Sequence, residues 1–425
     1  MKKHISHVVI IGSHVVIIGW ICSVVLGLHG CSNADELLGI TEVIKEAEHL
    51  AGTDLVLANT EFAFDLLAKI HQQQPNENIF ISPFSISLAL SMTLNGAEGK
   101  TQLAMANTLK LDLISLDEAN QTYAKLRKSL QVLDTKVELS IANSLWLRQG
   151  VTFKPDFLER NQNFFGTKVA ALDFDQPQSV GIINRWVSQN TNKNIPKIID
   201  SISPQMVMLI INAIHFKGRW SKEFDKSKTR EKDFQLLGEG TKRVPMMHQS
   251  GKYLYYSGSN FQVINLPYGS GRIGMYIFLP NSDTFLGDFL TNLNADNWKG
   301  WISKLHKLEG DVALPRLKFT YEASLNRVLK VLGMEVAFAP NIANFGGMRP
   351  VPPNLFITEV KHKSFVEVNE EGAEAAAATS VEIGVTSIPQ KFSLMVNRPF
   401  LFVIQDNWTQ TLLFMGAVFE PVIEG

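Results

Sequence analysis

The sequence predicts a mixed α+β fold in which the sheets are antiparallel or mixed. Short runs rich in β-branched and aromatic residues recur along the chain, and stretches with apolar residues at helical spacing stand between some of them. The two kinds of segment do not alternate in strict strand-helix-strand order, which argues against a doubly wound parallel sheet. The chain has 425 residues, 45% of them hydrophobic, so it can bury a large core, and its length alone predicts two or three domains.

Apolar spacing and start signals locate the individual elements. Phe62, Leu66 and Ile70 follow the helical period, and Ser82-Pro83 is a good signal for a helix start. The predicted helices are Asn59–His71, Ser85–Leu94, Asp156–Phe165, Gly181–Asn190 and Leu325–Leu332. The predicted strands are Glu138–Leu147, Val207–Ile214, Val263–Pro267, Met275–Pro280, Val312–Phe319, Lys363–Val368, Leu401–Ile404 and Leu412–Val418.

Residues 1–30 have the layout of an export signal. Met1 and two lysines precede an apolar stretch that reaches about Leu28 and contains the heptapeptide SHVVIIG twice. The residues before Cys31 resemble a bacterial lipobox, in which the cysteine is lipidated, although His29 departs from the small or β-branched residue usual there. We expect an exported lipoprotein, anchored to a membrane through Cys31 in the periplasm or at the cell surface. An uncleaved N-terminal membrane anchor and ordinary secretion are the alternatives.

The remainder of the chain is interpreted as one unit on a tether. Residues 31–52 are acidic and helical in texture, which is typical of a tether, and residues 53–425 contain no further linker. The only cysteines, Cys22 and Cys31, precede residues 53–425, so no disulfide stabilises that unit. Lys and Arg number 40 against 41 Asp and Glu, with no basic stripe, and we therefore expect no nucleic-acid partner.

No motif for catalysis or cofactor binding fits its surroundings. Gly269–Gly274 matches the dinucleotide fingerprint G-x-G-x-x-G, but Met275–Pro280 after it predicts a strand where the phosphate needs a helix N-terminus. We interpret it as a hairpin turn. The chain has no G-x-S-x-G, Walker or H-E-x-x-H motif, and its ten histidines lack metal-ligand spacing. We expect no enzyme activity, no cofactor and no metal.

The segment NEEGAEAAAATSVEIGVTSIP, Asn369–Pro389, has a period of two residues. Every second position from 373 to 385 holds Ala, Ala, Ala, Thr, Val, Ile and Val in turn, whereas Glu374, Glu382 and small or polar residues stand between them. Such alternation predicts a half-buried strand. An Ala-rich exposed loop or a short helix is the alternative.

Several longer motifs carry a family resemblance. They are Asn78–Ile86 (NIFISPFSI), Asn95–Thr101 (NGAEGKT), Ile183–Val187 (INRWV), Ile211–Trp220 (INAIHFKGRW), Leu266–Tyr268 (LPY), Leu314–Leu317 (LPRL), Asn397–Phe400 (NRPF) and Phe414–Gly416 (FMG). With them the sequence resembles the serpins, a family of serine protease inhibitors, from about Asn59 to Pro421. The resemblance implies a single domain of three β-sheets and eight or nine helices, with an exposed reactive-centre loop at about residues 370–392.

By the same resemblance, the hinge of this loop follows Glu-Glu-Gly. Its residues would be Glu370, Glu371, Gly372, Ala373, Glu374, Ala375, Ala376, Ala377, Ala378 and Thr379. Once cut, such a loop enters the middle of the largest sheet as an extra strand, and small side chains suit insertion between strands ~4.8 Å apart. The family's spacing from Gly372 implies a reactive bond at Thr386-Ser387, with Val385-Thr386 as the alternative. The small apolar residues before it suit an elastase-like or subtilisin-like protease. Ala373 stands where Thr or Ser is usual.

The resemblance implies suicide inhibition, in which the protease becomes covalently bound to Thr386 and is trapped when the loop inserts. A hydrogen-bonded cluster would lie where the sheet opens, formed by Ser82, Ser85, Asn212 and His362. Trp220, Arg316 and Glu370 would mark the start of insertion, with an ion pair between Arg316 and Glu370. We expect a monomer whose partners are a target protease and, through its N-terminus, a membrane. A non-inhibitory binding or carrier module is the alternative.

Overall fold

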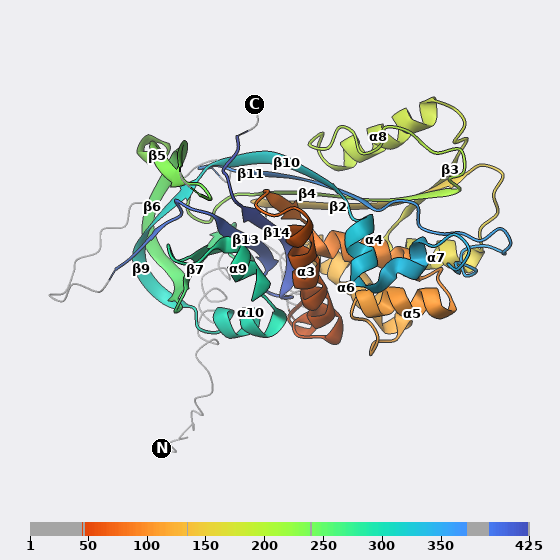
Figure 1. Cartoon of the computed structure of the whole chain (residues 1–425), viewed down its shortest axis with the longest axis horizontal. Coiled ribbons are helices and arrows are strands. Elements are labelled where there is room, and N and C mark those ends of the chain that lie inside the picture. Colours follow the sequence, from red (N-terminus) through yellow and green to blue (C-terminus); the bar gives the residue numbers. More distant parts are fainter. Residues whose placement is uncertain (1–44, 46, 134, 239, 372–390, 424–425) are drawn as a thin grey trace, which may run out of the picture. The chain divides into compact units, whose positions relative to one another are not determined.

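The computed structural model describes residue 45 and residues 47–133, 135–238, 240–371 and 391–423. Residues Glu46–Gly425 form one compact unit that is not divided further, so the two or three domains predicted from length are not seen in it. The predicted α+β class is confirmed, since helices and three sheets both contribute to this unit (Figure 1). Within the described ranges, no helix is both long and apolar enough to cross a membrane.

The largest sheet has nine strands. Its order is β1-β14-β13-β8-β7-β6-β9-β12, and β5 pairs with β6 outside this path. The strands are β1 (Ile79–Ile81), β5 (Arg230–Gln235), β6 (Thr241–Ser257), β7 (Phe261–Tyr268), β8 (Ile273–Pro280), β9 (His306–Pro315), β12 (Phe392–Met395), β13 (Phe400–Asp406) and β14 (Thr411–Val418). Every residue of β8, β13 and β14 is buried, as expected of continuous apolar runs covered on both faces.

Residues 269–272 of the glycine-rich segment 269–274 form the turn between β7 and β8, and Ile273 and Gly274 already belong to β8. These two strands pair antiparallel, with Tyr268 opposite Ile273. Gly269 and Gly271 have positive φ angles of 51° and 96°, which glycine adopts without the steric penalty of a side chain. The interpretation of this segment as a hairpin, rather than a dinucleotide site, is confirmed.

Two smaller sheets lie next to each other. One has the order β3-β2-β4, and the other pairs β10 with β11. Their bounds are β2 (Val137–Arg148), β3 (Lys168–Leu172), β4 (Met208–Gly218), β10 (Leu317–Ser324) and β11 (Lys361–Val368). The single strand predicted over Val312–Phe319 was wrong, because the chain leaves the nine-stranded sheet after Pro315 and joins β11 from Leu317 onward.

Nine α-helices have their bounds within the described residues, and all five predicted helices are among them; residue 45 and residues 47–50 are helical as well. The helices are α3 (Asp54–Gln73), α4 (Pro83–Leu94), α5 (Gly99–Thr108), α6 (Leu116–Leu130), α7 (Pro155–Phe165), α8 (Gln178–Asn190), α9 (Leu286–Thr291), α10 (Ala295–Ile302) and α11 (Asn326–Leu329). The predicted helix Leu325–Leu332 is interrupted after Leu329, where a short π-type turn, Lys330–Met334, follows. Helices α5, α6, α9 and α10 were not predicted.

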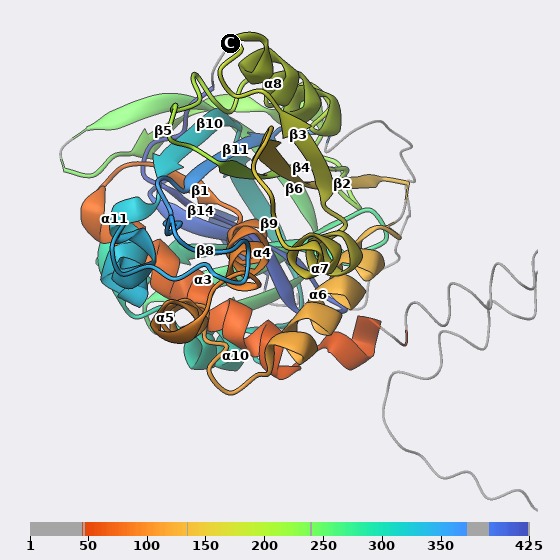
Figure 2. The same cartoon turned by 90° about the vertical axis from the view of Figure 1, so that its right-hand side faces the viewer.

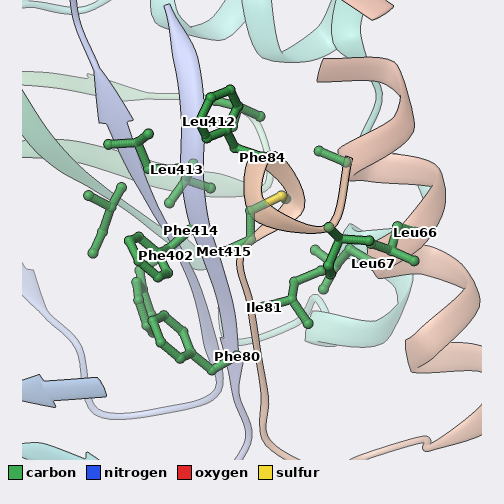
Figure 3. Packing of buried hydrophobic residues seen from close by; sticks show 14 of the residues in the cluster. Leu66, Leu67, Phe80, Ile81, Phe84, Phe402, Leu412, Leu413, Phe414 and Met415 are labelled. Carbon is green, nitrogen blue, oxygen red and sulfur yellow. The ribbon is translucent and has the colours of Figure 1, made fainter. Parts of the chain in front are cut away.

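The core lies between the sheets and the helices. Helix α4 buries almost all of its residues and packs Phe84 near Leu412 and Leu413 of β14, while Leu66 and Leu67 of α3 pack beside Ile81 (Figure 3). Helix α8 lies on the other side of β2 and β4 from α4 and α7 (Figures 1 and 2). A second, smaller core packs α8 against these strands. It is formed by Trp146, Phe174, Ile183, Val187, Ile195, Ile198, Ile199, Ile211 and Ala213. Strands β2 and β4 are therefore covered on both faces where they carry residues of this core, whereas Glu138 and Lys217 at their other ends are exposed.

Candidate functional site

Strands β4 and β11 are neighbours that do not pair. Each has a partner on its far side, β2 for β4 and β10 for β11, and among the described residues no ladder joins the two. A cavity of about 480 Å³ lies between their C-terminal halves, lined by residues 215–218 of β4 and 365–368 of β11. The resemblance implies insertion into the largest sheet. The gap lies instead between the three-stranded sheet of β2, β3 and β4 and the two-stranded sheet of β10 and β11.

The predicted start of insertion lies at one end of the gap. Trp220 follows β4, is buried, and stacks on Tyr268 with ring centroids 4.2 Å apart. Its indole N–H donates a 2.9 Å hydrogen bond to the carbonyl oxygen of Asn369, the residue after β11. The ends of β4 and β11 are therefore joined just before the segment predicted to be the hinge of the reactive loop.

The predicted ion pair between Arg316 and Glu370 is confirmed. The Arg316 Nε and Nη2 atoms lie 2.6 to 2.9 Å from the carboxylate oxygens of Glu370, whose side chain is 2% exposed. The hydroxyl of Thr229 also donates to this carboxylate. Burial raises the pKa of Glu370, but hydrogen bonds from Arg316 and Thr229 outweigh it and leave the pKa below its ordinary value. Glu370 is consequently held as a carboxylate at the root of the predicted reactive loop, Glu370–Glu371.

The segment after Trp220 makes further contacts with the loop root that the sequence did not reveal. The Phe224 N–H donates to the carbonyl oxygen of Glu370 at 3.1 Å, and Lys226 forms an ion pair with Glu371. The Lys226 and Glu371 side chains are exposed, so their pair contributes little to stability. Charges and turn residues in DKSKT (225–229) predict an exposed turn, but no periodic signal indicates that this turn contacts the loop root.

Three of the four residues in the predicted cluster lie together where the start of α4 meets β11. Ser82 caps α4, and its Oγ accepts the Ser85 N–H at 3.3 Å and donates to the Leu413 carbonyl at 2.6 Å. The Ser82 N–H donates to Nε2 of His362 at 3.2 Å, which requires a neutral, acceptor nitrogen there. Burial lowers the pKa of His362 to about 4. A neutral imidazole on β11 is thereby fixed to the start of α4.

Asn212, the fourth residue, bonds elsewhere. Its Nδ2 donates to Oδ1 of Asn143 at 2.6 Å, and Asn143 in turn donates to the Phe165 carbonyl at 2.9 Å. Asn212 and Asn143 stand directly opposite each other on β4 and β2. The four-residue hydrogen-bonded cluster expected from the resemblance is therefore split, because Asn212 belongs to the strand on the other side of the gap.

The rest of the predicted site lies outside the described residues. This applies to the hinge from Gly372 to Thr379, to the reactive bond Thr386-Ser387, and to Cys31. Of the ten hinge residues, the structure places Glu370 and Glu371. In the part of the chain that the structure describes, no group of three or more His, Cys, Asp or Glu side chains could hold a metal ion.

Comparisons with known proteins find one family and many relatives over most of the chain. The family model described as Serpin (serine protease inhibitor) matches residues 57–421. Leukocyte elastase inhibitor A of Mus musculus is 33% identical over 376 residues, 86% of this chain and 98% of that protein. An uncharacterised serpin-like protein of Thermococcus kodakarensis is 35% identical over 387 residues, 89% of this chain and 88% of that one. Among solved structures, the thermophilic serpin tengpin in its native state has a TM-score of 0.78 at 31% identity, covering 86% of this chain and 94% of that one.

Proposed function

This chain belongs to the serpin family, and we propose that it inhibits serine proteases by inserting its cleaved reactive loop between β4 and β11. Serpins are protease inhibitors rather than enzymes, which agrees with the lack of a catalytic motif in the sequence. The observation that carries the proposal is the unpaired gap between β4 and β11, with the root of the loop at its end.

The gap offers backbone partners to an arriving strand. The facing edges of β4 and β11 have no ladder between them in the described residues, so a strand placed there would pair on both sides. Because the loop leaves the C-terminal end of β11 beside Trp220, it would have to turn back and run antiparallel to both strands. Filling the gap would join the two smaller sheets into one, and this new pairing is the proposed source of free energy.

The alternating hinge pattern suits this route. In an inserted strand, Ala373, Ala375 and Ala377 would face the core with no bulk and no charge, whereas Glu374 and Glu382 would face the other way. A large or charged side chain on the inner face would clash or lose its hydration. The sequence of the hinge is therefore compatible with insertion along its whole length.

Trapping would follow cleavage at Thr386-Ser387. The catalytic serine of the protease attacks the Thr386 carbonyl, the peptide bond to Ser387 breaks, and the serine oxygen remains bound to Thr386 as an ester. Insertion of residues 373–386 would draw this ester about 45 Å along the sheet, at about 3.3 Å per residue. Distortion of the protease active site would then stop ester hydrolysis, because that step tolerates little misplacement.

Residues before the proposed bond suggest the target class. Ile383, Val385 and Thr386 are small or medium-sized and uncharged, which suits an elastase-like or subtilisin-like pocket and not one that requires a cation. The mouse relative named as an elastase inhibitor supports this class. We further propose that Cys31 tethers the exported protein to a membrane, on the strength of the lipobox-like residues before it.

Incubation with pancreatic elastase and with subtilisin tests the proposed function. We expect a protease-inhibitor complex that survives boiling in detergent, together with release of a C-terminal peptide that begins at Ser387. Cleavage of the loop without a stable complex, and without a gain in thermal stability, would instead indicate the non-inhibitory binding or carrier function.

A further inference from the structure

The α8 turn, residues 191–195, forms part of the wall of the gap between β4 and β11. Asn192 and Asn194 of this turn line the cavity of about 480 Å³, together with His215 of β4 and Phe365 of β11. A strand that entered the gap would therefore have to pass the α8 turn. Whatever holds this turn in place controls how easily the gap admits a strand.

The backbone of the α8 turn has an unfavourable conformation. Asn192 and Lys193 have φ angles of 48° and 65°, in the left-handed region. Asparagine tolerates that region, but in lysine the Cβ atom lies too close to the following carbonyl oxygen. A conformation of this kind persists only where surrounding contacts impose it. We therefore expect the turn to change shape readily once its contacts are broken.

Two side-chain contacts fix the α8 turn to the three-stranded sheet. The Asn192 Nδ2 donates to the Glu138 carboxylate on β2. The Asn194 Nδ2 lies 3.3 Å from Nδ1 and 3.5 Å from Nε2 of His215 on β4. Glu138 is exposed, so water competes for the first contact, whereas His215 is only 6% exposed. The contact with His215 is consequently the better shielded of the two.

The contact between Asn194 and His215 requires a neutral imidazole. The Asn194 Nδ2 also donates to the Thr191 carbonyl oxygen at 3.2 Å, which fixes the NH₂ end of the amide in this place. An NH₂ group can donate only to a ring nitrogen that carries no proton, and a protonated imidazole has none. Burial lowers the pKa of His215 and keeps the ring neutral near pH 7. Protonation would therefore break the contact, because the amide could not turn its oxygen to the ring without losing its bond to Thr191.

We propose that His215 makes the α8 turn sensitive to acid: the turn is held at the gap at neutral pH and is released in weak acid, so that a strand enters the gap faster. The inference rests on the proposed function, since it adds a control of insertion at the same gap. It assigns this control to a residue outside the reactive loop.

Charged groups around His215 set the pH range of this release. Glu138 on β2 favours protonation of His215, and Lys217 on β4 opposes it. Glu367 and Glu371 line the same cavity from the β11 side. In the released turn the imidazole would be hydrated and would have its ordinary pKa of 6.5, so protonation favours release once the pH falls below that value. At pH 5.5 this gain can reach about tenfold in the equilibrium between held and released turn.

A fluorescent peptide with the sequence of residues 373–386 tests access to the gap without a protease. Uncut protein is mixed with the peptide at pH 7.5 and at pH 5.5, and the rate of peptide incorporation is followed by fluorescence anisotropy. We expect incorporation to be about three- to tenfold faster at pH 5.5 for the parent protein. Equal rates at the two pH values would overturn the proposal.

Substitutions of His215 separate the α8 turn from other effects of acid. His215→Gln keeps an acceptor oxygen for Asn194 but cannot be protonated, so its rates at the two pH values should agree within about twofold. His215→Ala removes the contact, so the peptide should enter quickly at both pH values. His248→Gln, on β6 of the nine-stranded sheet, controls for the loss of a histidine and should keep the pH dependence of the parent. His362 is present in every variant, so its own protonation cannot produce these differences. A His215→Gln protein that retains the full acceleration would overturn the proposal.

Hydrogen exchange of the α8 turn provides a readout that depends neither on the peptide nor on inhibition. The Asn194 N–H donates to the Thr191 carbonyl oxygen at 2.9 Å, and the Ile195 N–H donates to the Thr191 hydroxyl at 3.2 Å. After correction for the intrinsic pH dependence of exchange, we expect their protection to fall about three- to tenfold between pH 7.5 and 5.5 in the parent and to stay constant in His215→Gln. Constant protection in the parent would reject release of the turn. A parent protein that forms no complex with any protease, yet shows these changes in protection, would reject the proposed function while retaining the acid-sensitive turn.

Discussion

Replacing Arg316 by alanine tests the role of the buried carboxylate at the loop root. The substitution removes three contacts of 2.6 to 2.9 Å and leaves Glu370, with a side chain only 2% exposed, to Thr229 alone. Exposed ion pairs contribute up to about 1 kcal/mol, and breaking a fully buried one costs about 3–5 kcal/mol. Because the Arg316 side chain is 38% exposed, we expect an intermediate loss of about 2 kcal/mol in the free energy of unfolding.

Thermal unfolding of the uncut protein measures this loss. For a unit of this size we expect the midpoint to fall by about 2.5 °C. Lys226→Ala is the matched control, since it removes a neighbouring pair whose two side chains are exposed, and its midpoint should stay within about 1 °C of the parent. Equal effects of the two substitutions, or no effect of Arg316→Ala, would refute the reasoning that burial of Glu370 makes its partner important.

Three further predictions concern pH, the loop and the N-terminus. His362 has a pKa of about 4 in the folded protein and 6.5 as an ordinary histidine. Its contribution to the free energy of unfolding is therefore complete above pH 6.5 and is lost as the pH falls towards 4. Lowering the pH from 7 to 5 should therefore cost about 2 kcal/mol through this residue, and His362→Gln should abolish that part of the pH dependence measured by denaturant unfolding. Ala377→Pro removes a backbone N–H from the inserting strand, so the variant should be cleaved as a substrate; an unchanged stoichiometry of inhibition would argue against insertion. Mass spectrometry of the mature N-terminus should find a lipid on Cys31, and an intact leader or an unmodified cysteine would contradict the tether.

Three of the strands that were predicted well are covered by the core on both faces. The segments Met275–Pro280, Leu401–Ile404 and Leu412–Val418 are continuous apolar runs, and burial of β8, β13 and β14 explains why composition alone located them. β5 was missed because four of its six residues are exposed and charged, and β12 because it has only four residues. The break at Arg316 was missed because LPRLKF keeps the alternation of a single strand while the chain passes from one sheet to another.

The candidate site was predictable only in part for a similar reason. The ion pair between Arg316 and Glu370 joins residues 54 positions apart, and the family resemblance supplied it where spacing could not. Contacts made by Phe224, Thr229 and Lys226 depend on how the turn after β4 folds back, which leaves no periodic trace. The bond from Asn212 to Asn143 follows from the register of β2 on β4, and the sequence pattern does not fix that register.

Comparison of the uncut and loop-cleaved proteins by differential scanning calorimetry tests the central claim most directly. If the native chain stores free energy in the unfilled gap, cleavage near Thr386 should let residues 373–386 pair with β4 and β11, and the cleaved protein should unfold at a clearly higher temperature than the uncut one. A cleaved protein that unfolds at the same temperature or lower would contradict loop insertion and the inhibitory mechanism with it.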